Sequence, residues 1–339
     1  MNRNWLIIGT FAAILTVVAV IAVMFVIPHE PTLPVVGIVY DAEKGDLSYT
    51  DSAYRGLFAA QEVMKFTKKE FSSINDPEFA ELVESPREAE KPGLIITVGY
   101  DNAEETVRLA RTHPEILFLA IDQAGTGSDN VNAYEITSYG ESYLAGVLAA
   151  SATKTRHVGI ILGTRSDLLE GFRQGYIAGV HAVDPTLAVE EEYVRENSTA
   201  GFSDPDRAAE IAGTMYRKGA DVIYTAAGYS GTGAIREAKA APGRYIIGVD
   251  SDQSHLGPNV VLASAVKRVD RVVYTGIGEY LNGSLTGGEQ AAGLRDGVTG
   301  LSFNPKFAGY NSTVRAWDVK AEEAEATYLA SRAFPLQES

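Results

Sequence analysis

The sequence contains no cysteine among its 339 residues. This absence excludes disulfide frameworks, thiolate nucleophiles, cysteine-ligated zinc sites and a lipidated N-terminal cysteine. Basic residues are also scarce, since 29 Lys and Arg stand against 44 Asp and Glu and give a formal net charge of −15. Because nucleic-acid binding requires a basic surface, this composition argues against a nucleic-acid partner. An acidic surface favours a domain that stays dispersed, and we predict a monomer.

Histidine is sparse and scattered, at positions 29, 113, 157, 181 and 255. No His-x-x-x-His pair or acidic cluster has the spacing of metal ligands, and no Gly-x-Ser-x-Gly nucleophile elbow is present. We therefore predict no metal site, no cofactor and no enzymatic activity.

An uncharged apolar run extends from Trp5 to Ile27. A helix of this length spans the hydrocarbon core of a bilayer, about 30 Å thick. Arg3 precedes the run and the next basic residue is Lys44, so the positive-inside rule places residues 1–4 in the cytoplasm. We predict a single-pass cell-membrane anchor at 5–27, a proline-rich linker at 28–34 and an extracytoplasmic remainder. The alternative is a long cleaved signal peptide, which also exports the remainder.

Beyond residue 34, apolar runs typical of strands alternate with helical patterns. Strands are predicted at 35–40, 94–98, 116–121, 157–162, 188–194, 221–225, 245–249 and 260–265. Helices are predicted at 52–67, 103–112, 143–153, 169–183, 208–218, 233–240 and 269–281. Residues 68–92 resemble a solvated surface excursion. This alternation predicts α/β architecture with two doubly wound parallel sheets, and a binding cleft outside the carboxyl ends of their strands.

Several polar residues follow these strands directly, where such a fold presents side chains to a ligand. They are Asp41, Asp46, Thr50, Asp122, Gln123, Asp250 and Lys267, together with the glycine-rich segment 228–233. Aspartates are typical acceptors for vicinal hydroxyls, Lys267 balances their charge, and Gly228 permits close approach of the backbone. The alternative for each single Asp is a helix cap or a turn.

Aromatic residues lie in or beside the same segments, namely Tyr49, Tyr54, Tyr176, Phe202 and Tyr229. Two rings that flank a slot would stack on a planar base, each contact contributing about 1–3 kcal/mol. Tyr176 shares a helix face with Phe172 and Val180, so core packing is predicted for it instead.

Six segments then match a known family in order. They are GDLSYTDSAYRGL (45–57), FLAIDQ (118–123), GFSDPDRAAEIA (201–212), ADVIYTAAGYSGTGAI (220–235), YIIGVDSDQ (245–253) and SAVKRVDRVVY (264–274). Over residues 35–300 the chain resembles the basic membrane protein family of substrate-binding proteins, the nucleoside receptors of ABC importers. GVDSDQ followed by S-x-V-K-R-V-D is the most specific part of the match.

The resemblance implies a type I periplasmic-binding-protein fold, with two lobes joined by three crossovers. We assign 35–138 and 264–290 to lobe 1, 139–263 and 291–320 to lobe 2, and 321–339 to a C-terminal tail. By position, Tyr54 and Phe202 would sandwich the base, with Asp46 and Thr50 near its edge. Asp122, Asp250 and Lys267 would address the ribose and the polar end of the ligand, and Gly228 would offer backbone contact.

The chain also departs from the family pattern. The usual pair of acids reads Gly45-Asp46 here, and the following K-S-F-N reads Leu47-Ser48-Tyr49-Thr50. Loss of one acid and of the Asn amide bears on base preference. The predicted function is capture of a nucleoside, with purines favoured, and its delivery to an ABC permease with its ATPase. The alternatives are a membrane-anchored sensor or regulator of the same fold, and a nucleoside hydrolase using Asp250, Asp252 and His255.

Overall fold

A computed structural model of the protein describes residues 33–85, 87, 90–123 and 127–332. The predicted membrane-spanning segment, 5–27, and the short segment before it lie outside these described residues. Among the residues that are described, no helix is long and apolar enough to cross a membrane.

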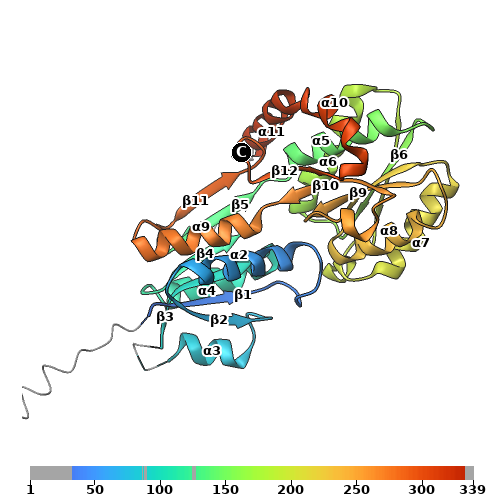
Figure 1. Cartoon of the computed structure of the whole chain (residues 1–339). Helices are drawn as coiled ribbons and strands as arrows, with labels where there is room; N and C mark the ends of the chain where they lie inside the picture. The colour runs from blue at the N-terminus through green and yellow to red at the C-terminus, as the bar shows by residue number, and fades with distance from the viewer. Residues whose placement is uncertain (1–32, 86, 88–89, 124–126, 333–339) are drawn as a thin grey trace, which may run out of the picture. The chain divides into compact units, whose positions relative to one another are not determined.

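Lobe 1 is built on a parallel sheet that has six strands within the described residues, in the order β2-β1-β3-β4-β5-β11 (Figure 1). These strands are β1 (Val35–Val39), β2 (Thr67–Phe71), β3 (Pro92–Val98), β4 (Leu117–Ile121), β5 (Val131–Ile136) and β11 (Gly288–Ala292). One face packs on α2 (Tyr49–Val63) and α9 (Val269–Asn282), and the other on α3 (Pro77–Val83) and α4 (Ala103–Thr112). The central strands are apolar because both faces of the sheet are buried.

Lobe 2 repeats this arrangement, again with six strands in the described part of the chain, ordered β7-β6-β8-β9-β10-β12. They are β6 (His157–Leu162), β7 (Ala188–Tyr193), β8 (Val222–Ala226), β9 (Tyr245–Asp250), β10 (Val261–Lys267) and β12 (Thr299–Phe303). All pairs are parallel except β10 with β12. Helices α5 (Tyr139–Ala152) and α6 (Asp167–Val183) cover one face, and α7 (Pro205–Arg217) and α8 (Gly231–Ala238) cover the other.

Short 3₁₀ segments connect several of these elements: η1 (Tyr100–Asn102), η2 (Thr199–Phe202), η3 (Gly228–Ser230), η4 (Ser254–Leu256) and η5 (Pro305–Tyr310). Within the described residues the chain passes between the sheets three times, after β5, after β10 and after β11. The expected pair of α/β lobes with parallel sheets is therefore confirmed. Residues 264–267, assigned to lobe 1 from the sequence, instead belong to β10 of lobe 2.

The chain ends in two further helices, α10 (Asn311–Arg315) and α11 (Asp318–Arg332), which lie beside α5 in Figure 1. Residues 321–332, assigned to a tail from the sequence, thus belong to a packed helix. The buried Glu325 carboxylate accepts hydrogen bonds from Thr137 Oγ1 at 2.7 Å and from the backbone N–H groups of Gly140 and Leu294 at 3.0 Å. Glu325 therefore ties α11 to the first and third passages between the sheets.

Candidate functional site

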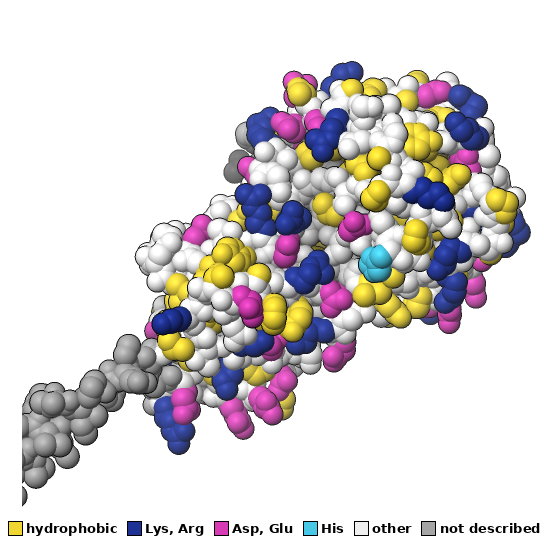
Figure 2. Space-filling model, in the orientation of Figure 1, with side chains coloured by type: hydrophobic (Ala, Val, Ile, Leu, Met, Phe, Trp, Pro, Cys, Tyr) yellow, Lys and Arg dark blue, Asp and Glu magenta, His cyan; other side chains and the backbone are white. Residues whose placement is uncertain are grey.

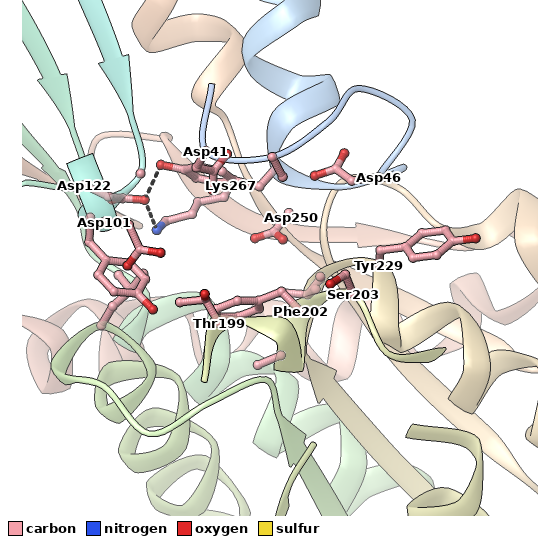
Figure 3. Close-up of a pocket in the computed structure, with 18 of the residues that line it drawn as sticks. Asp41, Asp46, Asp101, Asp122, Thr199, Phe202, Ser203, Tyr229, Asp250 and Lys267 are labelled. Atoms are coloured by element: carbon pink, nitrogen blue, oxygen red, sulfur yellow. Dashed lines mark hydrogen bonds and ion pairs between the residues drawn. The ribbon is translucent and has the colours of Figure 1, made fainter. Parts of the chain in front are cut away.

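A cavity of about 690 Å³ lies at the carboxyl ends of the strands of both sheets. Lobe 1 contributes the segments that follow β1, β3 and β4, and lobe 2 contributes those around β8, β9, β10 and η2. Figure 3 shows Asp41, Asp122 and Lys267 on one side, Phe202 and Thr199 on the opposite side, and Asp250 between them. The cavity therefore occupies the place that the alternation of strands and helices predicts for a ligand.

Six of the eight predicted binding residues line this cavity: Asp46, Asp122, Phe202, Gly228, Asp250 and Lys267. Thr50 and Tyr54 do not. Thr50 is fully buried beside the cavity wall, and its hydroxyl donates to Asp41 Oδ1 at 2.9 Å. The ring of Tyr54 lies under Lys44 Nζ, 4.7 Å from the ring centroid. The structure therefore does not bring Tyr54 to the place expected for a second stacking ring.

Asp122 and Lys267 form a buried ion pair in the cavity wall. Lys267 Nζ lies 2.6 Å from Asp122 Oδ2, and the Tyr49 hydroxyl donates to the same oxygen at 2.7 Å. The backbone N–H of Ile136 donates to Asp122 Oδ1 at 3.0 Å. The rings of Tyr49 and Phe172 lie 5.5 and 5.7 Å from the lysine ammonium. Asp122 therefore acts chiefly as an anchor for Lys267, whose ammonium retains further N–H donors for a ligand.

Asp250 ends β9 with φ +61°, a left-handed conformation that turns its side chain into the cavity. Its Oδ2 accepts a hydrogen bond from Ser48 Oγ at 2.5 Å. Burial raises the pKa of this carboxyl to about 6, against the opposing effects of the Ser48 hydroxyl and the Lys267 charge. Near pH 7 Asp250 is therefore an acceptor that is poised for donors on a ligand.

Asp41 also lines the cavity. The sequence placed it among the polar residues that follow the first strand, but the eight residues assigned from the resemblance do not include it. Asp41 is exposed within the cavity, yet desolvation by the surrounding protein raises its pKa to about 7. Its side chain packs against Gly99, where a Cβ would lie 2.6 Å from the Asp41 Cβ. Gly99 has φ +93°, so glycine is required there both for its conformation and for the space it leaves.

Asp46 serves the start of α2. Its carboxylate accepts hydrogen bonds from the backbone N–H groups of Ser48, Thr50 and Asp51 at 2.8–3.1 Å. These are N–H groups that a helix start leaves without intrahelical partners. The capping role that the sequence left open for an isolated Asp therefore applies to Asp46, even though it borders the cavity.

Phe202 forms the aromatic side of the cavity. It ends η2 and packs on Gly163, where an added Cβ would lie 2.5 Å from the ring. Gly228, with φ +53°, approaches the same side chain. The ring of Tyr229 is 40% exposed and points away from Asp250 (Figure 3). Tyr176 is fully buried in the core of lobe 2, as predicted from its helix face.

These features agree with the comparisons with known proteins. The family described as "ABC transporter substrate-binding protein PnrA-like" matches residues 33–323. The chain belongs to this family. It is 34% identical over 283 residues to Basic membrane protein B of Borrelia garinii subsp. bavariensis, covering 80% of this chain and 82% of that protein. It is 33% identical over 273 residues to the ABC transporter nucleoside-binding protein BmpA of Lactococcus lactis subsp. cremoris, covering 74% of this chain and 76% of that protein.

A solved structure supports the same assignment. The ABC transporter solute-binding protein of Aeropyrum pernix K1 superimposes with a TM-score of 0.71 at 25% identity, covering 88% of this chain and 86% of that one. The family resemblance drawn from the six sequence segments is thereby confirmed.

The binding cavity of this PnrA-like protein is acidic. Two lysines line it, Lys44 and Lys267, against six carboxylates: Asp41, Glu43, Asp46, Asp101, Asp122 and Asp250. Both lysines are already paired, Lys44 with Glu70 at 2.8 Å and Lys267 with Asp122. The arrangement suits a neutral ligand rich in hydrogen-bond donors and opposes an anionic one.

Two observations bear on the metal-site and hydrolase alternatives. Among the described residues, no group of three or more His, Asp or Glu side chains could hold a metal ion. Asp252 and His255, considered for a hydrolase, do not line the cavity. On the face shown in Figure 2, Lys and Arg are interspersed with Asp and Glu rather than gathered into a basic stripe.

Proposed function

We propose that this protein is an extracytoplasmic receptor that captures a nucleoside, with purines favoured, and delivers it to an ABC permease with its ATPase. The observation that carries the proposal is one cavity that combines a half-buried aromatic ring, a buried ammonium and two acceptor carboxylates. A nucleoside combines an aromatic base with a hydroxylated sugar, and each part finds its complement there.

The size and lining of the cavity support a small amphipathic ligand. A volume of about 690 Å³ lies within the roughly 300–1,000 Å³ typical of small-molecule sites. In the proposed pose the base stacks on Phe202, while Lys267 and Asp250 bind the ribose hydroxyls. Asp41 accepts from the edge of the base, and Gly228 offers backbone contact. Asp46 and Thr50 act from behind the wall, through the start of α2 and through Asp41.

The transport step rests on the two-lobe architecture. We expect the lobes to close about the three passages between the sheets and to present a new surface to the permease. The predicted anchor at 5–27 would hold the receptor at the outer face of the membrane as a monomer. The name of the Lactococcus lactis relative, a nucleoside-binding protein of an ABC transporter, supports this ligand class for the present chain.

Thermal melting against a ligand panel tests the proposal. The panel contains purine and pyrimidine nucleosides, free bases, ribose, hexoses and nucleoside 5′-monophosphates. A nucleoside at about 100 times its dissociation constant should stabilise the protein by roughly 2.7 kcal/mol, a shift of several degrees. The monophosphates should give no shift, because the acidic lining repels a dianion.

The other outcomes of the panel are equally decisive. A shift with sugars alone would keep the fold but replace the ligand class. No shift with any compound would contradict the receptor proposal for small polar solutes. Chromatography of the nucleoside after incubation checks the hydrolase alternative, and we expect the nucleoside to be recovered intact.

A further inference from the structure

Three consecutive residues at the start of α2 each donate a side-chain hydroxyl to a different carboxylate of the cavity. The pairs are Ser48 with Asp250 at 2.5 Å, Tyr49 with Asp122 at 2.7 Å, and Thr50 with Asp41 at 2.9 Å. We call Ser48, Tyr49 and Thr50 the hydroxyl triplet. Two of its acceptors belong to lobe 1 and the third, Asp250, ends β9 of lobe 2.

We propose that the hydroxyl triplet is the positioning element of the site: it orients Asp41 and Asp250 so that their remaining acceptor positions face the ligand, and it holds Asp122 in place as the anchor of Lys267. This inference rests on the proposed function, since it describes how the same cavity is prepared for a nucleoside. It assigns a role to three residues that act through other side chains, and two of them, Tyr49 and Thr50, depart from the family's Phe and Asn.

The geometry of a helix start explains how neighbours in sequence reach separate targets. Tyr49 and Thr50 are successive residues of α2 and lie about 100° apart around its axis. Ser48 is the residue before the helix and has a non-helical backbone, so its side chain takes a third direction. The Asp46 carboxylate fixes this first turn by accepting the N–H groups of Ser48, Thr50 and Asp51. Asp46 therefore fixes the backbone of the hydroxyl triplet, and the side chains of the triplet in turn bind the three carboxylates.

Burial strengthens the hydrogen bonds to Asp250 and Asp122 most. Ser48 and Thr50 are fully buried, and Asp250 and Asp122 are 9% and 6% exposed, whereas Asp41 is exposed within the cavity. Hydrogen bonds from a hydroxyl to a charged carboxylate are strengthened where water does not compete. Ser48 and Thr50 each occupy one carboxylate oxygen, which directs ligand donors to the rest of the group.

The effect of the triplet can be measured through the pKa values of Asp41 and Asp250, which also depend on the charged groups around them. Asp41 is faced by Asp46, Asp250, Tyr49 and Tyr100. Asp250 is faced by Lys267, Asp41, Asp46, Asp122, Tyr49 and Tyr224. Desolvation raises the pKa of both groups, and the Thr50 and Ser48 hydroxyls oppose that rise. Removal of one hydroxyl should therefore raise the pKa of its own partner further.

The experiment uses the full chain and four variants: Ser48→Ala, Tyr49→Phe, Thr50→Val and Thr50→Ser. Carbon-detected NMR titration of the Asp side chains, without ligand, reports Asp41 and Asp250 separately. We expect Thr50→Val to move the titration of Asp41 upward and Ser48→Ala to move that of Asp250. Calorimetry with the nucleoside that stabilises the wild type should show about tenfold weaker affinity for the three variants that lack a hydroxyl, Ser48→Ala, Tyr49→Phe and Thr50→Val. Thr50→Ser should restore both titration and affinity.

A matched control is available on the same helix. Ser52 Oγ accepts a hydrogen bond from the Asp270 N–H at 3.2 Å and contacts no cavity carboxylate. Ser52→Ala should lower the melting temperature while the titrations and the affinity stay as in the wild type. The inference is overturned if Thr50→Val behaves like Ser52→Ala. If the wild type binds no nucleoside, the proposed function fails, and the ligand-free titrations still decide the role of the triplet.

Discussion

The two lobes are built in the same strand order, yet the ends of their equivalent strands differ. The fourth strand of each order, β4 in lobe 1 and β9 in lobe 2, is followed or ended by an Asp with positive φ, Asp122 and Asp250. At the end of the second strand in the series, lobe 1 has Asp41 after β1, whereas lobe 2 has Gly163 after β6. One architecture thus supports a polar wall in lobe 1 and an aromatic wall, Phe202 on Gly163, in lobe 2.

The two equivalent aspartates also differ in their partners. Asp122 is engaged by Lys267, the Tyr49 hydroxyl and a backbone N–H, whereas Asp250 accepts one hydroxyl, from Ser48. The first is a structural anchor and the second is an acceptor available to ligand. The two carboxylates lie at equivalent backbone positions, but the donors around each one determine whether it is free to accept hydrogen bonds from a ligand.

The largest expected effect separates these two aspartates. Asp122→Asn removes the counter-charge of a buried lysine and should lower the free energy of unfolding of the ligand-free protein by about 3 kcal/mol. Asp250→Asn weakens the hydrogen bond from Ser48, because an amide oxygen accepts less strongly than a carboxylate, and it removes a buried charge, so its change should stay below about 1 kcal/mol. Guanidinium denaturation at pH 7.5 measures both, and equal losses in the two variants would erase the distinction.

A double variant sharpens the test. Asp122→Asn with Lys267→Met removes both charges, so we expect most of the lost stability to return. Ligand affinity should stay weak, because the Lys267 ammonium is proposed to bind the ligand directly. Recovery of affinity together with stability would contradict that role.

The sequence predicted most of the central strands, though not β5, and it predicted one of the four edge strands, β7, but not β2, β11 or β12. β1, β3, β4, β6 and β9 are short apolar runs with both faces buried, and their pattern reveals them. β2 reads TKKEF and lay inside the predicted surface excursion, and β11 reads GEQAA with Ala292 alone buried. Such edge strands are held by backbone hydrogen bonds to one neighbour, which side-chain periodicity does not report.

The site was predictable wherever a residue directly follows a strand, as for Asp122, Asp250 and Lys267. For the residues around the start of α2, the direction of each side chain depends on where the helix begins. The predicted helix began at Ser52, but α2 begins at Tyr49, where Asp46 receives its first N–H groups. Thr50 lies three residues before the buried Ala53, so the helix turns Thr50 toward the core rather than the ligand. A start three residues earlier could not be read from hydrophobic spacing alone.

The aromatic wall of lobe 2 supplies a smaller test. Gly163→Ala places a Cβ 2.5 Å from the Phe202 ring, which must move away from its position beside the cavity. Because one base–aromatic contact contributes about 1–3 kcal/mol, affinity for a nucleoside should fall about tenfold. Gly300→Ala, in β12 of the same sheet with no atom within 4 Å of the new Cβ, is the control and should bind as the wild type does. An unchanged affinity in Gly163→Ala would remove Phe202 from the binding surface.

The smallest expected effect concerns pH and the polar wall of lobe 1. Desolvation raises the pKa of Asp41 from 3.8 to about 7, so folding favours the protonated carboxyl. This contribution to stability is fully present below about pH 4 and is lost as the pH rises through about 7. Asp41 is exposed within the cavity, so solvent screening should reduce the effect. Between pH 8 and pH 5.5 the ligand-free wild type should gain less than about 1 kcal/mol relative to Asp41→Asn, whose amide does not titrate. Over the same range nucleoside affinity should weaken, because a protonated Asp41 accepts donors less well than the carboxylate. Melting curves and calorimetry at matched pH measure the two trends, and if they ran in the same direction, Asp41 would not be the acceptor that lobe 1 presents to the ligand.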